Sequence, residues 1–315
     1  MDSTDVLIFC EMSFKYFDYS GGKRRPSSKG IGEKLGLDER TVRLRIRKME
    51  REGFIRYYQA IPNLRLLGQP LAYLCNFQTT DITTKHRAIA MIREADDIID
   101  IADYLGESFG VTISAASEED AQQTIAKLSR KIGTPRFGLL PPRQFPSPMR
   151  TLGKLDWELV KSLRYDALKT TREVARETGS THRMADYAIG RLFESQALFT
   201  RAIINAKDSK GIIFYSLNLN VEDGKQQRIT NDLRAALGER LWWTFTPPGQ
   251  PLILFLFSTS IGKAEDDLLD ALQLPGINGG SLTIFKGWVE PERPSWIDRR
   301  VEEKIRSQTS PVSAK

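Results

Sequence analysis

One feature constrains the fold of this chain more than any other: the sequence repeats itself at a spacing of 143 residues. Gly36 is matched by Gly179, and the same spacing relates positions far along the chain. The further pairs are Val42 and Ala185, Ile46 and Ile189, Met49 and Leu192, Ile55 and Leu198, Ile98 and Leu241, Gly106 and Gly249, Val111 and Leu254, Ser117 and Ser260, and Leu139 and Leu282. Because apolar positions keep this register without a gap over more than a hundred residues, we expect two copies of one folding unit. The first copy carries extra residues at 17–25.

The beginning of the first copy has the pattern of a winged helix-turn-helix. Residues 5–17, 28–35 and 39–52 show helical periodicity, and the segment 54–61 is expected to form a hairpin wing. Asp38 is a natural N-cap for the third helix, and Gly53 is a natural stop.

Beyond Leu71 the periodicity changes to that of a βαββαβ unit, which is the ferredoxin-like order. The expected strands are 71–77, 98–104, 109–115 and 136–140, with helices at 84–95 and 118–131. The second copy repeats the unit with strands at 212–219, 241–246, 252–258 and 281–288, and with helices at 224–237 and 262–272. The predicted fold is therefore α+β, with two tandem copies of a winged helix-turn-helix plus a ferredoxin-like domain.

These patterns divide the chain into six segments. They are a winged helix-turn-helix at 1–66, a ferredoxin-like domain at 67–140, a Pro-rich linker at 141–150, a second winged helix-turn-helix at 151–206, a second ferredoxin-like domain at 207–292, and a C-terminal helix and tail at 293–315. A membrane span is not expected because no run of about 18 apolar residues occurs. The two cysteines, Cys10 and Cys75, lie in apolar runs that do not indicate a disulfide, and we expect a cytoplasmic protein.

Positive charge is concentrated in the first winged helix-turn-helix. The net charge of the whole chain is +6, whereas residues 23–65 alone carry 13 Lys and Arg against five acids. On a helical wheel of 39–52, Val42, Ile46 and Met49 form an apolar stripe, and arginines form the opposite stripe. A helix that enters the major groove of double-stranded DNA needs such a basic outer stripe. The candidate DNA-binding residues are Arg40, Arg43, Arg45, Arg47, Lys48, Arg51, Lys29 and Arg56. The alternative for the stripe is a solvated basic helix face.

The segment 31–68 resembles the DNA-binding head of the Lrp/AsnC (feast/famine) family of bacterial and archaeal regulators. The matching positions are Ile31, Leu35, Gly36, Val42, Arg45, Ile46, Met49, Glu50, Gly53 and Ile55. The resemblance implies a transcription regulator that dimerises through its sheets and senses amino acids or related small molecules. The family's usual chain holds one copy, so the tandem form is a departure.

A second departure lies at the loop between the middle strands of each ferredoxin-like domain. The family commonly carries a Gly-Asp-Tyr-Asp type sequence there, at its effector pocket. The candidate effector-binding residues at this loop are Gly106, Glu107 and Ser108 in the first copy, and Gly249 and Gln250 in the second. Because the acidic and aromatic groups are mostly gone, a plain hairpin turn is the favoured alternative.

The second copy is expected to be an eroded DNA reader. The positions that match Arg40, Arg43, Arg47 and Arg51 are Arg183, Asp186, Gly190 and Glu194. The apolar stripe of Ala185, Ile189 and Leu192 is intact, so packing is kept while groove-facing charge is lost. This pattern favours a scaffold, a dimer partner or an effector module.

Other chemistry has little support in the sequence. His86 and His182 are the only histidines and lack the spacing of a metal site, and no phosphate-binding glycine loop occurs. We therefore expect a DNA-binding regulator with no cofactor, metal or catalytic residues, and not an enzyme. The alternative is a siroheme-decarboxylase-like enzyme, since those enzymes resemble the same two-domain layout, although the α+β domains are poor in histidine. A protein-interaction scaffold would leave the arginine stripe unexplained.

Apolar residues occur on both faces of the expected strands at 71–77 and 212–219. The open faces of the two sheets are therefore expected to be buried against each other, as an internal pseudo-dimer. Such a chain would hold one competent DNA-reading head, so we expect a homodimer of chains that brings two first-copy heads onto one duplex.

Overall fold

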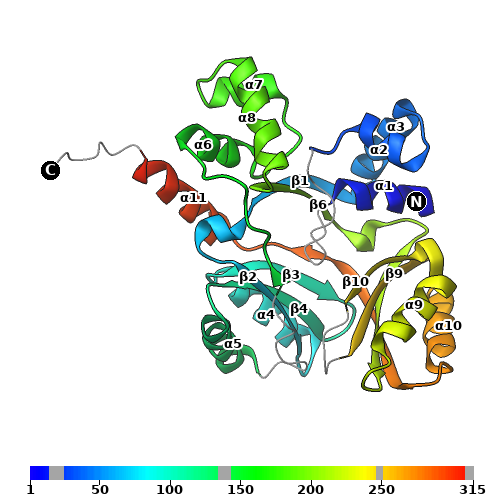
Figure 1. Cartoon of the computed structure of the whole chain (residues 1–315). Helices are drawn as coiled ribbons and strands as arrows, with labels where there is room; N and C mark the ends of the chain where they lie inside the picture. The colour runs from blue at the N-terminus through cyan, green and yellow to red at the C-terminus, as the bar shows by residue number, and fades with distance from the viewer. Residues whose placement is uncertain (14–24, 134–142, 246–250, 309–315) are drawn as a thin grey trace.

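The structure is a computed structural model that describes residues 1–13, 25–133, 143–245 and 251–308. Two small helical heads lie above a layer of β-sheet flanked by helices (Figure 1). The first head contains α1 (Ser3–Met12), α2 (Ser28–Leu35) and α3 (Glu39–Arg51), and the second contains α6 (Lys154–Leu163), α7 (Thr171–Glu177) and α8 (His182–Glu194). No helix in the described ranges is long and apolar enough to cross a membrane.

The caps expected for α3 are present. The Asp38 side chain accepts a hydrogen bond from the Thr41 amide, and Gly53 adopts a left-handed φ of 81° directly after the helix. The first helix ends at Met12, earlier than predicted, and the remainder of the predicted range falls partly outside the described residues, as do the extra residues at 17–24.

The hairpin wing predicted at 54–61 is wrong. This segment forms one strand, β1 (Ile55–Pro62), which pairs antiparallel with β6 (Leu198–Ile204) of the second copy. The segment contains no Gly, Asn or Asp that would turn the chain. It therefore runs straight, and the equivalent strand of the other copy satisfies its backbone groups.

The β1–β6 ribbon lies on a local pseudo-two-fold axis. Gln59 lies opposite Arg201 at the centre of the ribbon. The pairs on either side of this centre are related by the axis: Ala60 lies opposite Thr200, and Tyr58 lies opposite Ala202. A bulge after Ile55 adds one residue to the first copy, so from here to the first sheet strand the copies are related by a spacing of 142. The predicted register without a gap therefore fails at this bulge.

The ferredoxin-like halves have the predicted topology. The first half contains β2 (Leu71–Gln78), α4 (Ile82–Arg93), β3 (Ile98–Tyr104), β4 (Ser108–Ala115), α5 (Glu118–Ile132) and β5 (Arg143–Gln144). The second contains β7 (Ile213–Val221), α9 (Gln226–Leu237), β8 (Leu241–Phe245), β9 (Leu252–Ser258), α10 (Ile261–Leu272) and β10 (Ile277–Val289). The strand order β5-β2-β4-β3-β10-β7-β9-β8 gives each half the same internal order. The strand predicted at 136–140 lies outside the described residues.

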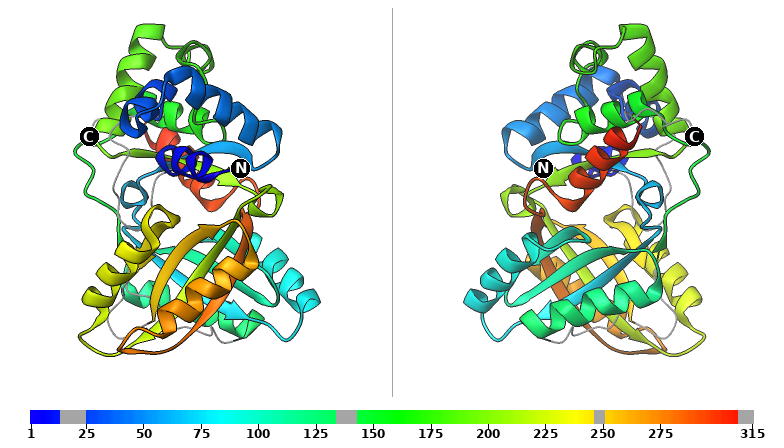
Figure 2. Two further views of the ribbon diagram at one scale, coloured as in Figure 1. Left: turned by 90° about the vertical axis from the view of Figure 1, so that its right-hand side faces the viewer. Right: turned by 90° about the vertical axis from the view of Figure 1, so that its left-hand side faces the viewer.

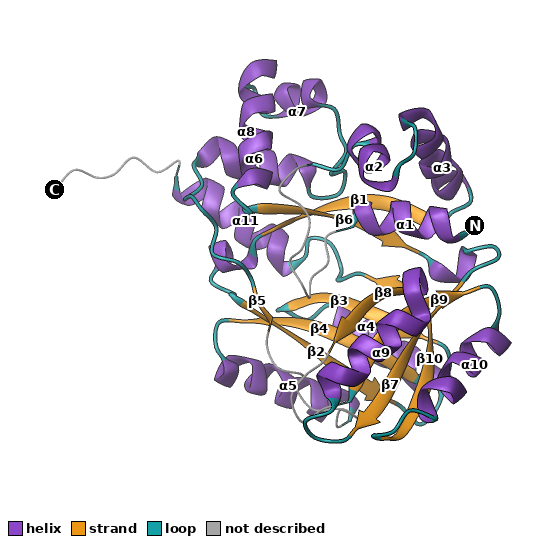
Figure 3. Ribbon diagram, turned by 45° about the vertical axis from the view of Figure 1, so that its right-hand side comes forward, coloured by secondary structure: helices purple, strands orange, loops and turns teal. Residues whose placement is uncertain are grey.

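The two half-sheets are joined along an edge and also face each other. Strand β10 bends from one half into the other, and its Phe285 pairs with both Phe214 of β7 and Tyr104 of β3. Helices α4 and α5 lie on one outer side, with α9 and α10 on the other (Figures 1 and 3). The open faces are buried as predicted: Leu74 of β2 and Ser216 of β7 are each 6% exposed and line one cavity between the half-sheets.

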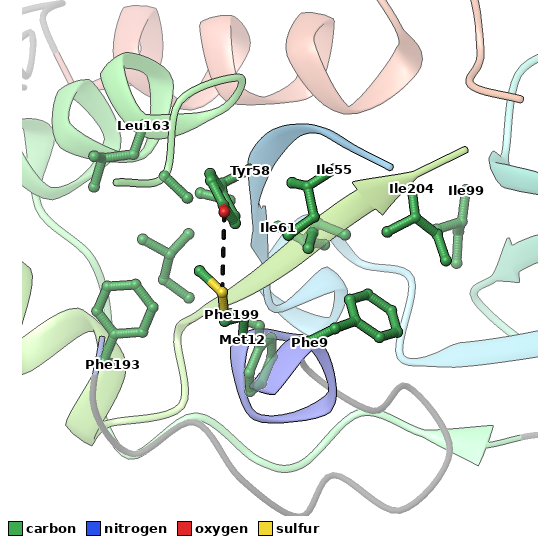
Figure 4. Packing of buried hydrophobic residues seen from close by; sticks show 14 of the residues in the cluster. Phe9, Met12, Ile55, Tyr58, Ile61, Ile99, Leu163, Phe193, Phe199 and Ile204 are labelled. Atoms are coloured by element: carbon green, nitrogen blue, oxygen red, sulfur yellow. Dashed lines mark hydrogen bonds between the residues drawn. The ribbon is translucent and has the colours of Figure 1, made fainter. Parts of the chain in front are cut away.

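The heads and the sheets share one core. Phe9 and Met12 of α1 pack with residues of β1, β6 and α8, and the Tyr58 hydroxyl contacts the Met12 sulfur (Figure 4). The described part of the predicted Pro-rich linker also joins the folded structure. Its strand β5 pairs with β2, and Phe145 is buried in the shared core. The last helix of the described residues is α11 (Trp296–Ser307), which packs against α6. Figure 2 shows α11 beneath the heads.

A buried polar cluster fastens the ribbon to the sheet. Arg201 is ion-paired with Asp100 of β3, and the side chains are 5% and 1% exposed. The guanidinium also donates to Gln59 Oε1 at 2.8 Å, and Gln59 donates to Glu290 at 3.1 Å. The Arg201 guanidinium lies 5.9 Å from the ring centre of Trp288 on β10. One cluster thus links both copies and both layers.

We expect Asp100→Ala to lower the free energy of unfolding by roughly 3–5 kcal/mol, because it leaves the buried Arg201 charge without its carboxylate. Urea denaturation measures this change. The matched control is Asp96→Ala, which removes an exposed carboxylate paired with Arg299 and should cost less than about 1 kcal/mol. Equal losses for the two variants would contradict the anchoring role of the cluster.

Candidate nucleic-acid interface

Helix α3 turns one face to the core and the other to solvent. Val42, Ile46 and Met49 are buried. The exposed face carries four arginines, Arg40, Arg43, Arg47 and Arg51. The two stripes predicted from the sequence are therefore a buried face and an exposed face of α3. We call the four exposed arginines the arginine stripe; they are accessible to a partner.

The turn before α3 is set by glycines and by the cap. Gly36 ends α2 with a left-handed φ of 68°, and a Cβ at Gly32 would lie 2.5 Å from the Leu37 carbonyl oxygen. The Thr41 hydroxyl and amide hold the pKa of the Asp38 carboxyl below its usual value. Gly32 was missed by the sequence analysis, because a close backbone approach leaves no periodic pattern.

The arginine stripe is weakly engaged within the chain. Arg43 pairs with Glu39 one turn away, and both side chains are about half exposed. Arg40, Arg47 and Arg51 make no ion pair with any side chain in the described ranges. An exposed pair of this kind contributes at most about 1 kcal/mol, so the stripe can exchange its contacts for phosphate at little cost.

The other basic residues predicted to bind DNA lie outside the arginine stripe. Arg45 is bound to Asp2 and to the buried Asp5, which raise its pKa and join α3 to α1. Lys29 pairs with Glu33 near the start of α2. Lys48 is half-buried, and the exposed Arg56 is the bulged residue of β1. Arg45 therefore has a structural partner, whereas the stripe does not.

The first candidate effector loop is held from inside by a lysine. Lys85 of α4 is 1% exposed, donates to the carbonyl oxygens of Tyr104 and Gly106, and pairs with Asp103. Gly106 adopts a left-handed φ of 77° at the turn that contains Glu107 and Ser108. Sequence reasoning missed Lys85, since a lone lysine on a helix usually faces water. Gly249 and Gln250 lie outside the described residues.

The two half-sheets enclose a small polar cavity of about 30 Å³. The asparagines Asn76 and Asn218, which are equivalent at the 142 spacing, line it from opposite sides, and the buried Asn76 Oδ1 has no hydrogen-bond partner in the described part of the chain. None of the residues that line it is a histidine, lysine or arginine. His86 and His182 lie exposed on α4 and α8, and the described residues contain no group of three or more His, Cys, Asp or Glu that could hold a metal ion.

The second head keeps the frame and changes the exposed face. Ala185, Ile189 and Leu192 are buried in α8, as in α3. Its outer face exposes Arg183, Asp186, Gly190 and Glu194, together with the apolar side chains of Met184 and Tyr187.

Comparisons with known proteins give likeness in structure only. No family model matches the sequence, and no curated protein matches it. The crystal structure of the siroheme decarboxylase NirDL superposes with a TM-score of 0.54 at 11% identity, covering 97% of this chain and 98% of that chain. The chain has the fold of NirDL. A NirDL complex with an iron-uroporphyrin III analogue matches equally, at 10% identity over 98% of both chains.

Regulators match over a shorter span. AsnC of E. coli covers 43% of this chain at 12% identity with a TM-score of 0.36, and LrpC of B. subtilis covers 45% at 12% identity with a TM-score of 0.35. The neighbours thus include Lrp/AsnC regulators, over less than half of the chain.

The full-length match bears on two expectations. It shows the predicted α+β fold, with the helix-turn-helix plus ferredoxin-like unit in tandem form; the strand β1, paired with β6, stands where the hairpin wing was expected. It contradicts the expectation that this chain is not an enzyme, because the two NirDL structures that match over the full length are structures of an enzyme. That expectation came from the histidine-poor α+β domains, and residue counts alone do not exclude catalysis on this layout.

Proposed function

We propose that the chain is a transcription regulator that binds double-stranded DNA through the arginine stripe of α3. The observation that carries the proposal is the exposure of Arg40, Arg43, Arg47 and Arg51 on one face of the second helix of a helix-turn-helix. Guanidinium groups suit phosphate oxygens and the O6 and N7 atoms of guanine. A helix with such a basic face fits the major groove, while its buried apolar stripe packs against the other helices of the head.

The second head is proposed as a non-reading partner. Its exposed face has Asp186 and Glu194 where the first head has Arg43 and Arg51, and carboxylates repel phosphate. One chain then offers one reading helix. Two chains on a palindrome would supply two reading helices about one helical turn apart, so we propose a homodimer on DNA.

We expect Arg47→Ala to weaken DNA binding by roughly 1–3 kcal/mol if its guanidinium reaches a base edge. Arg183→Ala, which removes the one arginine that the second head keeps at the four stripe positions, should have little effect. Fluorescence anisotropy with duplexes selected from genomic DNA measures both. Equal losses from the two changes would contradict a single reading head.

A second candidate is a siroheme-decarboxylase-like enzyme, and the observation that favours it is the NirDL likeness over 97% of this chain. The cavity between the half-sheets is an interior space shared by both copies, but at about 30 Å³ it holds little more than water. A tetrapyrrole there would require the half-sheets to separate. Its carboxylates would find no basic side chain among the residues that line the cavity.

Titration with an iron-uroporphyrin separates the candidates. An enzyme of this type predicts a saturable shift of the tetrapyrrole absorbance band, lost in Asn76→Trp, which fills the cavity between the half-sheets. Asn231→Trp on the outside of α9 is the matched control and should keep the shift. Absence of any saturable shift at micromolar protein would remove the decarboxylase candidate.

A further inference from the structure

The second head has an open hollow along the exposed face of α8. It measures about 490 Å³ and is lined by Met149, Arg150, Asp186, Tyr187, Gly190, Arg191, Glu194 and Ser195. Gly190 lines it, and a Cβ at this position would meet no atom within 4 Å. Met149 and Tyr187 are each 66% exposed at its sides. An apolar side chain of a partner can therefore enter between them.

With Arg150 neutralised by Asp156, the charged side chains left around this hollow are Asp186 and Glu194 against Arg191, a balance of one negative charge. Arg150 is ion-paired with Asp156, and Arg191 donates to the Tyr187 hydroxyl at 2.9 Å. Glu194 makes no ion pair with the described residues, and Asp186 accepts only a long hydrogen bond of 3.4 Å from Thr171. Arg183 lies in the first turn of α8, one turn before Asp186 and at the opposite end of the helix from Glu194; it does not line the hollow. The hollow thus suits an apolar group that is surrounded by bases.

The chain itself carries such a surface on α3. Leu44 is 56% exposed in the middle of the arginine stripe, at the position equivalent to Tyr187. Arg40, Arg47 and Arg51 stand on the same exposed side of the helix. An exposed leucine makes no hydrogen bond to phosphate, so it adds an apolar contact to the positive charge of this face.

We propose that, in the absence of DNA, a second copy of this chain docks the Leu44 face of its α3 into the α8 hollow. Leu44 enters above Gly190, and the arginines on either side of it meet Asp186 and Glu194. The contact is heterologous, because each chain uses a different patch, and it extends into rings or open chains unless it is blocked. It also covers the arginine stripe, so DNA competes with it; this competition, unlike the contact itself, rests on the proposed function.

Two variants test the contact by complementation. Gly190→Arg fills the hollow but keeps α3, and its new side chain has room and stabilises the helix. Leu44→Glu disables the α3 face but keeps the hollow. We expect light scattering of the wild-type chain to show a mass above one chain that rises with concentration, and each variant alone to stay at one chain. An equimolar mixture of the variants should form a two-chain species, since one intact pair of faces remains.

Three results would overturn the proposal: a wild-type chain that stays at one chain at high micromolar concentration, a variant that still self-associates, or a mixture that does not pair. Circular dichroism confirms that the variants are folded. Duplex DNA added to the wild-type chain should reduce the association. If the chain does not bind DNA, this last effect is lost while the complementation result stands, so the two proposals fail separately.

Discussion

The pairing of β1 with β6 is the interaction on which the rest of the structure depends. Each strand follows the last helix of its head, so the ribbon fixes the two heads side by side above the sheets. The Arg201–Asp100 ion pair then fastens the ribbon to the sheet layer. Because both strands belong to one chain, the pairing is intramolecular and does not depend on protein concentration.

The tandem arrangement frees positions near the pseudo-two-fold axis from being identical. In a symmetric dimer, a buried arginine at the centre of the ribbon would face its own copy, and like charges in a low-dielectric interior repel strongly. Here Arg201 faces Gln59, and each finds a hydrogen bond. The same freedom lets Arg47 on α3 correspond to Gly190 on α8, which divides the proposed roles between the heads.

Local patterns predicted the parts of the structure that local physics controls. The stripe of α3, its Asp38 cap and the βαββαβ order follow from periodicity and capping. The hairpin wing was wrong because the partner of β1 lies more than a hundred residues away, and no local pattern reveals such a partner. Arg45 was counted as a DNA-binding candidate because its ion pairs cannot be recognised locally. Its partners, Asp2 and Asp5, lie at the start of α1, far from Arg45 in the sequence. The buried Lys85 depends on backbone carbonyls that the sequence does not display.

The salt dependence of DNA affinity tests the central claim most directly, because it counts the phosphates that each head neutralises. Log K should fall linearly with log salt, with a slope of about −0.9 for each phosphate contact. Changing Arg51 to alanine on α3 should make the slope shallower by roughly one such contact, whereas Arg183→Ala on α8 should leave it unchanged. An affinity that is indifferent to salt, or a slope that depends on the second head, would contradict the account.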